Sequence, residues 1–396
     1  MRGLHLQVWL GVADLPNAMP FAILYGLQGV ARALPLTILP LTALEIMGSA
    51  QQVSLLYFGA SFVGLAGSLS MPLLVHMIRR RRVVALGTVL ICLAALLLSL
   101  GSGIVFAAGL ACFLVGFIAI DISFNLYLMD HIPRQEFGRF EPVRVLFMGS
   151  GFIIGPMAGI WLSQAFGRPA PFIAMAVVTV LVYLVFFYLR FSDNKAIQAA
   201  KSSPPNPFKF FPHFFKQNRL RLAWLLAVGR SSWWAMFFVY GPIYCVEAGL
   251  GETVAGMLVS AGSGAVLLCP LWAWLGHKWG IRRLLMVGYA ASAVASLAVA
   301  LVAGTPWLGV VFFLIAAFFT SIIDGAGNML FLRAVHAHER AEMTSVFATF
   351  RDTSQIGPPG VFSLLLSVFA LPAVFVAAGA GMMIMAWYSR YIPKQY

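Results

Sequence analysis

The chain has 396 residues, of which 61% are hydrophobic and only 10% are charged. Its mean hydropathy is +0.90, and apolar stretches long enough to cross a bilayer fill nearly the whole length. This composition excludes a soluble globule and indicates an all-α polytopic membrane protein. The net charge of +13 would suggest nucleic acid or anionic lipid as a partner of a soluble protein, but its placement along the chain explains it better.

The apolar segments predict twelve spanning helices, six on each side of a polar linker. Their expected ranges are 18–47, 52–78, 83–103, 104–130, 141–166, 170–190, 219–248, 252–277, 283–303, 305–332, 341–369 and 371–392. The linker contains the run Ser-Ser-Pro-Pro-Asn-Pro at 202–207, flanked by basic residues. We therefore predict an N-terminal six-helix bundle at 1–190, a cytoplasmic linker at 191–218 and a C-terminal six-helix bundle at 219–396.

Basic residues gather in the even-numbered loops and near the C-terminus, whereas the odd-numbered loops carry almost none apart from Arg168. By the positive-inside rule, both termini and the long middle loop are expected to be cytoplasmic. No basic cluster interleaved with exposed aromatic residues is expected that would argue for nucleic acid. The composition suggests a bacterial inner membrane, with the lipid bilayer as the protein's surroundings and a monomer as the expected state.

The sequence shows no motif of an enzyme. A phosphate-binding loop, a metal-ligand cluster and a nucleophile with a base at motif spacing are all missing. The four cysteines are scattered singly and are interpreted as packing residues. We therefore expect no enzymatic activity, no cofactor and no metal, and the lack of a nucleotide-binding domain disfavours ATP-driven transport.

The two halves of the chain are copies of one six-helix unit. Shifting the first half by about 202 residues brings landmarks onto one another within one residue. The pairs are Pro40 with Pro242, Glu45 with Glu247, His76 with His277, Asp121 with Asp324, Asn125 with Asn328, and 154–156 with 356–358. Because both halves start in the cytoplasm, this is a parallel repeat related by an axis along the membrane normal.

A polar pattern recurs in matching apolar helices of the repeat, as Asp121 with Asn125 and as Asp324 with Asn328. A carboxylate at membrane depth costs several kcal/mol unless it faces protein or a water-filled cavity. Two such segments at matching places indicate a substrate site at the interface of the repeats. Each Asn lies one turn from its Asp on the same helical face, where it would hydrogen-bond substrate or carboxylate.

Arginines are expected at a similar depth. A rise of 1.5 Å per residue places the two aspartates, Arg230 and Arg351 roughly 12–16 Å from the cytoplasmic ends of their helices, and Arg32 at about 20 Å. When the two halves are aligned by the repeat, Arg32 aligns with Trp234 and Gln28 aligns with Arg230. The two arginines are therefore one helical turn apart on equivalent faces.

These charges support two functional interpretations. In the first, Asp324 pairs with Arg351, and Asp121 pairs with Arg32 or Arg144. Protonation of a carboxylate would then be coupled to conformational change, because an unpaired buried charge costs about 3–5 kcal/mol. The alternative is that the same ion pairs have only a structural role and stay formed throughout. In the second interpretation, Arg32 and Arg230 hold an anionic phosphate or carboxylate ester through bidentate contacts.

The twelve helices, the central loop and the six-plus-six repeat resemble the major facilitator superfamily over essentially the whole chain. This resemblance implies two six-helix bundles, alternating access, a small-molecule substrate, and a cavity lined by the first, fourth, seventh and tenth helices. The loop motif of that family carries an Asp that latches the cytoplasmic side. His76 and His277 stand in its place here, with Arg282 in the second copy of the motif; each His would be either a pH-sensitive latch or a solvated interfacial residue.

The fifth helix carries Gly151, Gly155, Pro156 and Gly159, which looks like the Gly-x-x-x-Gly-Pro-x-x-Gly motif of the drug and proton antiporter branch. Glycines four apart form a flat stripe on which another helix packs closely, and Pro156 permits a bend. The motif is therefore either a hinge or a packing stripe. The Arg that this branch carries in its fourth helix is replaced by Cys112.

The sequence therefore predicts a secondary active transporter that moves a small organic solute by alternating access, with proton-coupled export as the expected mode. An organic-anion or phosphate-ester exchanger or uptake permease that uses Arg32 and Arg230 is one alternative. A non-transporting membrane receptor on the same fold is another. The mixture of charges and amides favours a zwitterionic or hydrogen-bonding solute.

Overall fold

The computed structural model describes residues 18–78, 80–132, 137–189, 207–302, 304–335 and 339–393, and all regular structure in them is helical. Eleven of its helical segments are long and apolar enough to cross a membrane. The twelfth expected span, 341–369, is divided into two helices, of which the longer has 17 residues. The structure confirms an all-α polytopic membrane protein and is consistent with twelve spans.

Contacts divide the chain into two compact units. Unit 1 contains residues 1–42 and 63–201, and unit 2 contains residues 43–62 and 202–396. Because residues 190–206 lie outside the described part, the expected boundaries of the N-terminal bundle at 190 and of the C-terminal bundle at 219 stay a prediction. Within the expected linker, Pro207–Lys216 forms the helix α9, which we did not predict.

Unit 1 is built around five helices that lie wholly within it. They are α2 (Ala18–Ala33), α5 (Arg80–Ser99), α6 (Gly103–His131), α7 (Phe137–Phe166) and α8 (Ala170–Tyr188). Two more, α3 (Ile38–Met47) and α4 (Ala50–Met77), have residues in each unit. The expected spans of this half differ from the helices by a few residues at their ends, except where α2 and α3 divide the first span.

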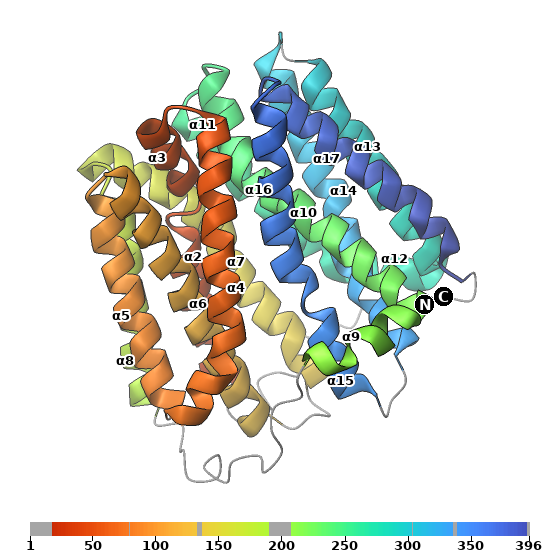
Figure 1. The fold of residues 1–396 in the computed structure, drawn as a ribbon, viewed down its shortest axis with the longest axis horizontal. Helices are drawn as coiled ribbons and strands as arrows, with labels where there is room; N and C mark the ends of the chain where they lie inside the picture. The colour runs from red at the N-terminus through yellow and green to blue at the C-terminus, as the bar shows by residue number, and fades with distance from the viewer. Residues whose placement is uncertain are drawn as a thin grey trace, which may run out of the picture. The chain divides into compact units, whose positions relative to one another are not determined.

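Unit 2 contains the remaining helices in addition to α9. They are α10 (Asn218–Glu247), α11 (Glu252–Gly264), η1 (Ala265–Leu268), α12 (Cys269–Trp279), α13 (Ile281–Leu301), α14 (Pro306–Ala334), α15 (Arg340–Phe347), α16 (Phe350–Leu366), α17 (Pro372–Tyr388) and η2 (Ser389–Tyr391). In Figure 1, α13 runs alongside α17, and α9 lies beside α15 at one end of the unit.

The same helix pairings occur in both units. In unit 1, α2 packs on α7, α5 packs on α6, and α5 also packs on α8. In unit 2 the equivalent pairs are α10 with α16, α13 with α14, and α13 with α17. Each unit thus repeats one arrangement of helices, as the internal repeat in the sequence implies.

Three expected spans are interrupted. The first is broken between α2 and α3, where Pro35 removes a backbone donor from the helix. The eighth passes through the short 3₁₀ segment η1 immediately before Pro270, which lies in the first turn of α12. The eleventh bends between α15 and α16, where the N–H of Arg351 donates to the carbonyl of Ala348, three residues back.

Candidate functional site

The carboxylate of Asp121 on α6 is held by two side chains of α2. Arg32 Nη1 lies 2.9 Å from one carboxylate oxygen, and Gln28 Nε2 donates a hydrogen bond to the other. Arg32 and Gln28 are four residues apart and therefore on the same face of the helix. Arg32 also lies in the last turn of α2, where the helix dipole favours a cation. Of the two expected partners of Asp121, Arg32 is the one for which the structure describes an ion pair.

Asn125 joins this group from the next turn of α6. The hydroxyl of Tyr25 donates a 2.9 Å hydrogen bond to its side-chain oxygen, and the guanidinium of Arg144 lies 5.1 Å from the centre of the Tyr25 ring. Tyr25, Gln28 and Arg32 thus form one polar row along α2. The oxygen of the Gln28 side chain is buried without a hydrogen-bond partner among the described residues, so the described contacts leave one acceptor of this row unsatisfied.

In unit 2 the carboxylate of Asp324 on α14 is held by α10. Arg230 Nε lies 3.2 Å from one oxygen, and the indole N–H of Trp234 donates a 2.8 Å hydrogen bond to the other. The neighbouring Trp233 donates to the hydroxyl of Ser296 at 2.9 Å. This bond joins α10 to α13, while the contacts of Arg230 and Trp234 with Asp324 join α10 to α14.

We call each of these groups a two-donor site: Asp121 with Gln28 and Arg32 in unit 1, and Asp324 with Arg230 and Trp234 in unit 2. The repeat register aligns Gln28 with Arg230 and Arg32 with Trp234. The geometry is therefore the same in both units, but the cation and the neutral donor have exchanged places. Each two-donor site thus contains one arginine and one carboxylate.

The two sites differ in burial. The side chains of Arg32 and Asp121 are 29% and 28% exposed, whereas those of Arg230 and Asp324 are only 9% and 19% exposed. Breaking a buried ion pair costs more than breaking an exposed one, because the remaining charge is poorly solvated. The carboxylate of unit 2 is therefore the more tightly held of the two.

Arg351 was the predicted partner of Asp324, but the ion pair that the structure describes for this carboxylate goes to Arg230. The guanidinium of Arg351 lies 5.7 Å from the centre of the Phe350 ring, and that of Arg230 lies at the same distance from it. Phe350 thus contacts both arginines. Asn328 is on α14, one turn beyond Asp324, but its side chain lies outside the described part.

The glycines of the expected hinge pack against α2. A methyl group at Gly155 would come within 2.5 Å of the side chain of Ala33, and one at Gly151 or Gly159 would collide with the α2 backbone or the residue that follows it. These glycines, with the buried Pro156, hold α7 directly against the helix that carries Gln28 and Arg32. In unit 2, Gly357 has nothing within 4 Å of the equivalent position, so the stripe is a property of unit 1.

The structure describes only some of the side chains that are expected to form the cytoplasmic latch. His76 is on α4 and His277 on α12, and the side chains of both lie outside the described part. Arg282 is the second residue of α13 and is half-buried. The structure therefore does not test the latch.

Sequence reasoning missed Gln28 and Trp234 as partners of the carboxylates. Both align with an arginine in the repeat register, and each lies four residues from the arginine of its own helix. This spacing places each of them on the same helical face as that arginine, which is the feature of the sequence that could have identified them. Among the described residues, no group of three His, Cys, Asp or Glu side chains is placed to hold a metal ion.

Comparison with known proteins identifies relatives over most of the chain. The family described as Major Facilitator Superfamily matches residues 21–359. The sugar efflux transporter A of Dickeya chrysanthemi is 24% identical over 374 residues, which cover 90% of this chain and 91% of that protein. The multidrug resistance protein MdtG of Dickeya zeae (strain Ech586) is 24% identical over 270 residues, which cover 67% of this chain and 65% of that protein.

Solved structures of transporters share the fold. The nucleoside transporter NupG superposes with a TM-score of 0.73 at 14% identity, covering 96% of this chain and 99% of that one. A peptide transporter POT in complex with sulfate superposes with a TM-score of 0.72 at 14% identity, covering 97% of each chain. At these identities the likeness concerns the fold alone.

Proposed function

The chain belongs to the Major Facilitator Superfamily, and we propose that it exports a small hydrogen-bonding solute in exchange for protons. Membership of this family and the transporter relatives make the chain a multi-pass membrane protein and a secondary transporter, not an enzyme. The solute, the coupling ion and the direction of transport are the parts that we propose.

Proton coupling is supported by the two-donor sites. Each carboxylate is held by one arginine and one neutral donor across two helices of its unit. Protonation would neutralise the carboxylate, remove the ion pair and leave the arginine uncompensated, which costs about 3–5 kcal/mol for a buried pair. A change of that size biases a conformational equilibrium strongly. Asp121 and Asp324 are therefore the proposed proton carriers.

A neutral, hydrogen-bonding solute suits the groups around the carboxylates. In unit 1 the partly exposed amide of Asn125 lies beside the buried Tyr25 and Gln28, and in unit 2 the partly exposed indole of Trp234 lies beside Asp324. Relatives named as a sugar efflux transporter and as multidrug resistance proteins agree with such a solute and with export. The Gly-x-x-x-Gly-Pro-x-x-Gly stripe of α7 is a further argument for the antiporter branch.

The alternative of anion exchange rests on one arginine in each unit, the two being one helical turn apart in the repeat register. Arg32 and Arg230 have the guanidinium group that binds phosphate or carboxylate in a bidentate manner. Both are engaged by an aspartate, so an anionic solute would have to compete with the carboxylates or bind when these are protonated. We therefore rank this alternative second.

Gating is assigned to residues away from the carboxylates. We propose that Gly151, Gly155, Pro156 and Gly159 let α7 and α2 move as one body, and that His76, His277 and Arg282 contribute to the cytoplasmic closure. Asn328 and Arg351 are proposed to assist the site of unit 2. The charge distribution supports cytoplasmic termini, and the bacterial relatives support a bacterial inner membrane. A monomer is the simplest working unit.

Proteoliposomes test this function directly. Purified protein is reconstituted with a pH-sensitive dye inside the vesicles, and a panel of sugars, drug-like amines and phosphate esters is added outside. We expect a sugar or amine to drive proton movement, and Asp121→Asn and Asp324→Asn to abolish it, while Glu252→Gln, at the first residue of α11, retains it. Phosphate-ester exchange that is insensitive to the pH gradient and lost in Arg32→Lys would refute proton-coupled export. Absence of flux with every solute would favour a receptor.

A further inference from the structure

Unit 2 contains a pocket that the transport mechanism does not use. It has a volume of about 690 Å³ and lies at the end of the unit where α10 begins and where α14 and α17 end. The charge distribution of the sequence assigns this end to the cytoplasmic side. We propose that the pocket binds the headgroup of an anionic phospholipid from the cytoplasmic leaflet.

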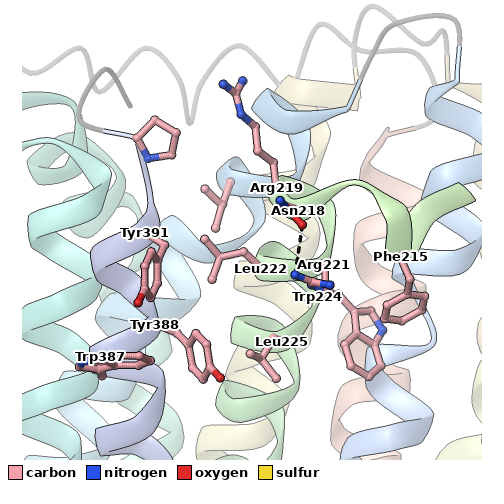
Figure 2. A pocket seen from close by; sticks show the side chains of 12 residues that line it. Phe215, Asn218, Arg219, Arg221, Leu222, Trp224, Leu225, Trp387, Tyr388 and Tyr391 are labelled. Carbon is pink, nitrogen blue, oxygen red and sulfur yellow. Dashed lines mark hydrogen bonds between the residues drawn. The ribbon is translucent and has the colours of Figure 1, made fainter.

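The composition of the pocket wall separates into two parts. Figure 2 shows Trp387, Tyr388 and Tyr391 on one side, and Leu222 and Leu225 of α10 on the other. Trp387 and Tyr391 are 48% and 62% exposed, although both are large aromatic residues. Exposed Trp and Tyr at the end of a spanning helix lie at headgroup level in a bilayer. This part of the wall suits the glycerol region and the first carbons of the acyl chains.

The other part of the wall is cationic. Arg219 and Arg221, in the first turn of α10, line the pocket, and Lys216 precedes them at the end of α9. A guanidinium has five N–H donors, and the described hydrogen bond of Arg221 to Asn218 uses one of them. None of the described residues that line the pocket is acidic. An anion is therefore the ligand that complements this charge.

The position of these arginines gives a further reason for an anion. The N-terminus of a helix carries a partial positive charge, so cations in the first turn are unfavourable and anions are stabilised. At α10 the first turn instead carries two arginines. A phosphate group bound there would be stabilised by the helix end and by the guanidinium groups together.

The neighbouring helix α9 supports a lipid rather than a soluble anion. Its sequence, Pro-Phe-Lys-Phe-Phe-Pro-His-Phe-Phe-Lys, combines five aromatic residues with two lysines, as in helices that lie in the plane of the membrane interface. Phe215 lines the pocket and packs edge-to-face on Trp224 with ring centres 5.3 Å apart. The pocket therefore opens next to a helix that is itself suited to the headgroup layer.

Lipid titration with native mass spectrometry tests the proposal. The protein is purified into phosphatidylcholine nanodiscs and titrated with phosphatidylglycerol, and lipid that stays bound after release from the nanodisc is counted. We expect phosphatidylglycerol to be retained over phosphatidylcholine, with an affinity that falls about fivefold for each charge removed in Arg219→Gln and Arg221→Gln. Arg283→Gln, an equal loss of charge on the exposed surface of α13, is expected to leave retention unchanged.

A photoreactive phosphatidylglycerol locates the lipid independently of these variants. We expect its crosslinks in the peptides that contain 215–225 and 387–393, and their loss in the double variant. Equal retention of both lipids, equal loss in Arg283→Gln, or crosslinks elsewhere would overturn the proposal. Competition of glycerol phosphate with the lipid at equal concentration would also overturn it, because the site would then be one for a soluble anion.

Discussion

The carboxylates of Asp121 and Asp324 occupy equivalent positions but receive their cation from different turns of the equivalent helices α2 and α10. In unit 1 the arginine is at position 32, and in unit 2 it is at the position that aligns with Gln28. The aspartate can therefore form its ion pair with an arginine at either of two successive turns of the partner helix. The two sites are equivalent in geometry and unequal in burial, which gives separate predictions for each residue.

Removal of the carboxylate is expected to destabilise unit 2 more than unit 1. Asp324→Asn leaves Arg230 uncompensated at 9% exposure, which costs about 3–5 kcal/mol, whereas Arg32 at 29% exposure retains more contact with solvent. Thermal unfolding of the two variants in detergent measures this difference. An equal decrease in melting temperature would contradict the assignment of the tighter pair to unit 2.

The exchange of donor positions predicts a rescue. Arg32→Gln removes the cation of unit 1 and should lower the melting temperature, and adding Gln28→Arg should recover most of that loss, since Arg230 occupies the aligned position in unit 2. Gln28→Arg alone is the control, because it places two arginines beside one aspartate and should not stabilise. If the double variant is no more stable than Arg32→Gln, the two positions are not equivalent.

At the level of helices, the sequence predicted the spans well and their interruptions poorly. Apolar length determined where each helix lies, because a spanning segment must satisfy its backbone internally. It did not reveal the break before α3, although Pro35 marks it, since a proline also occurs within α10 at Pro242 without ending that helix. Whether a proline bends or ends a helix depends on its packing, which one sequence does not contain.

The candidate site could be predicted only in part, for a similar reason. The repeat register pointed to Asp121 and Asp324, and their expected depth added Arg32, Arg230 and Arg351 as candidates, with Arg351 as the predicted partner of Asp324. It did not determine which partner each carboxylate would choose, because Arg230 and Arg351 were expected at a similar depth to Asp324, and depth alone does not say which side chains face each other. The choice depends on how α10 packs on α14 and contacts α13, to which the buried hydrogen bond from Trp233 to Ser296 contributes.

The close contact of α7 with α2 predicts how alanine substitutions in the glycine stripe affect stability. Gly155→Ala inserts a methyl group 2.5 Å from Ala33 in a well-packed interface and should destabilise the protein by about 1–3 kcal/mol. Gly357→Ala, at the aligned position of unit 2, meets nothing within 4 Å and should be neutral or slightly stabilising through helix propensity. The melting temperatures of both variants measure this difference in stability. Similar effects would mean that the glycine stripe is not specific to unit 1.

For the whole molecule, the repeat gives each unit its own aspartate–arginine pair, and the proposed exchange of protons for solute assigns a proton carrier to each unit. Solute exchange without a gradient needs only the binding and release of solute, whereas uphill movement needs the protons as well. A variant that cannot titrate should therefore retain the first activity and lose the second. This separation distinguishes a coupling role of the aspartates from a structural one.

The most direct test compares these two activities in the same proteoliposomes. With a solute identified by the flux panel, counterflow at equal pH on both sides is measured beside accumulation driven by a pH gradient, for the wild type, Asp121→Asn and Asp324→Asn. We predict that both variants retain counterflow and lose gradient-driven accumulation. Accumulation at the wild-type level in either variant would contradict the assignment of that aspartate as a proton carrier.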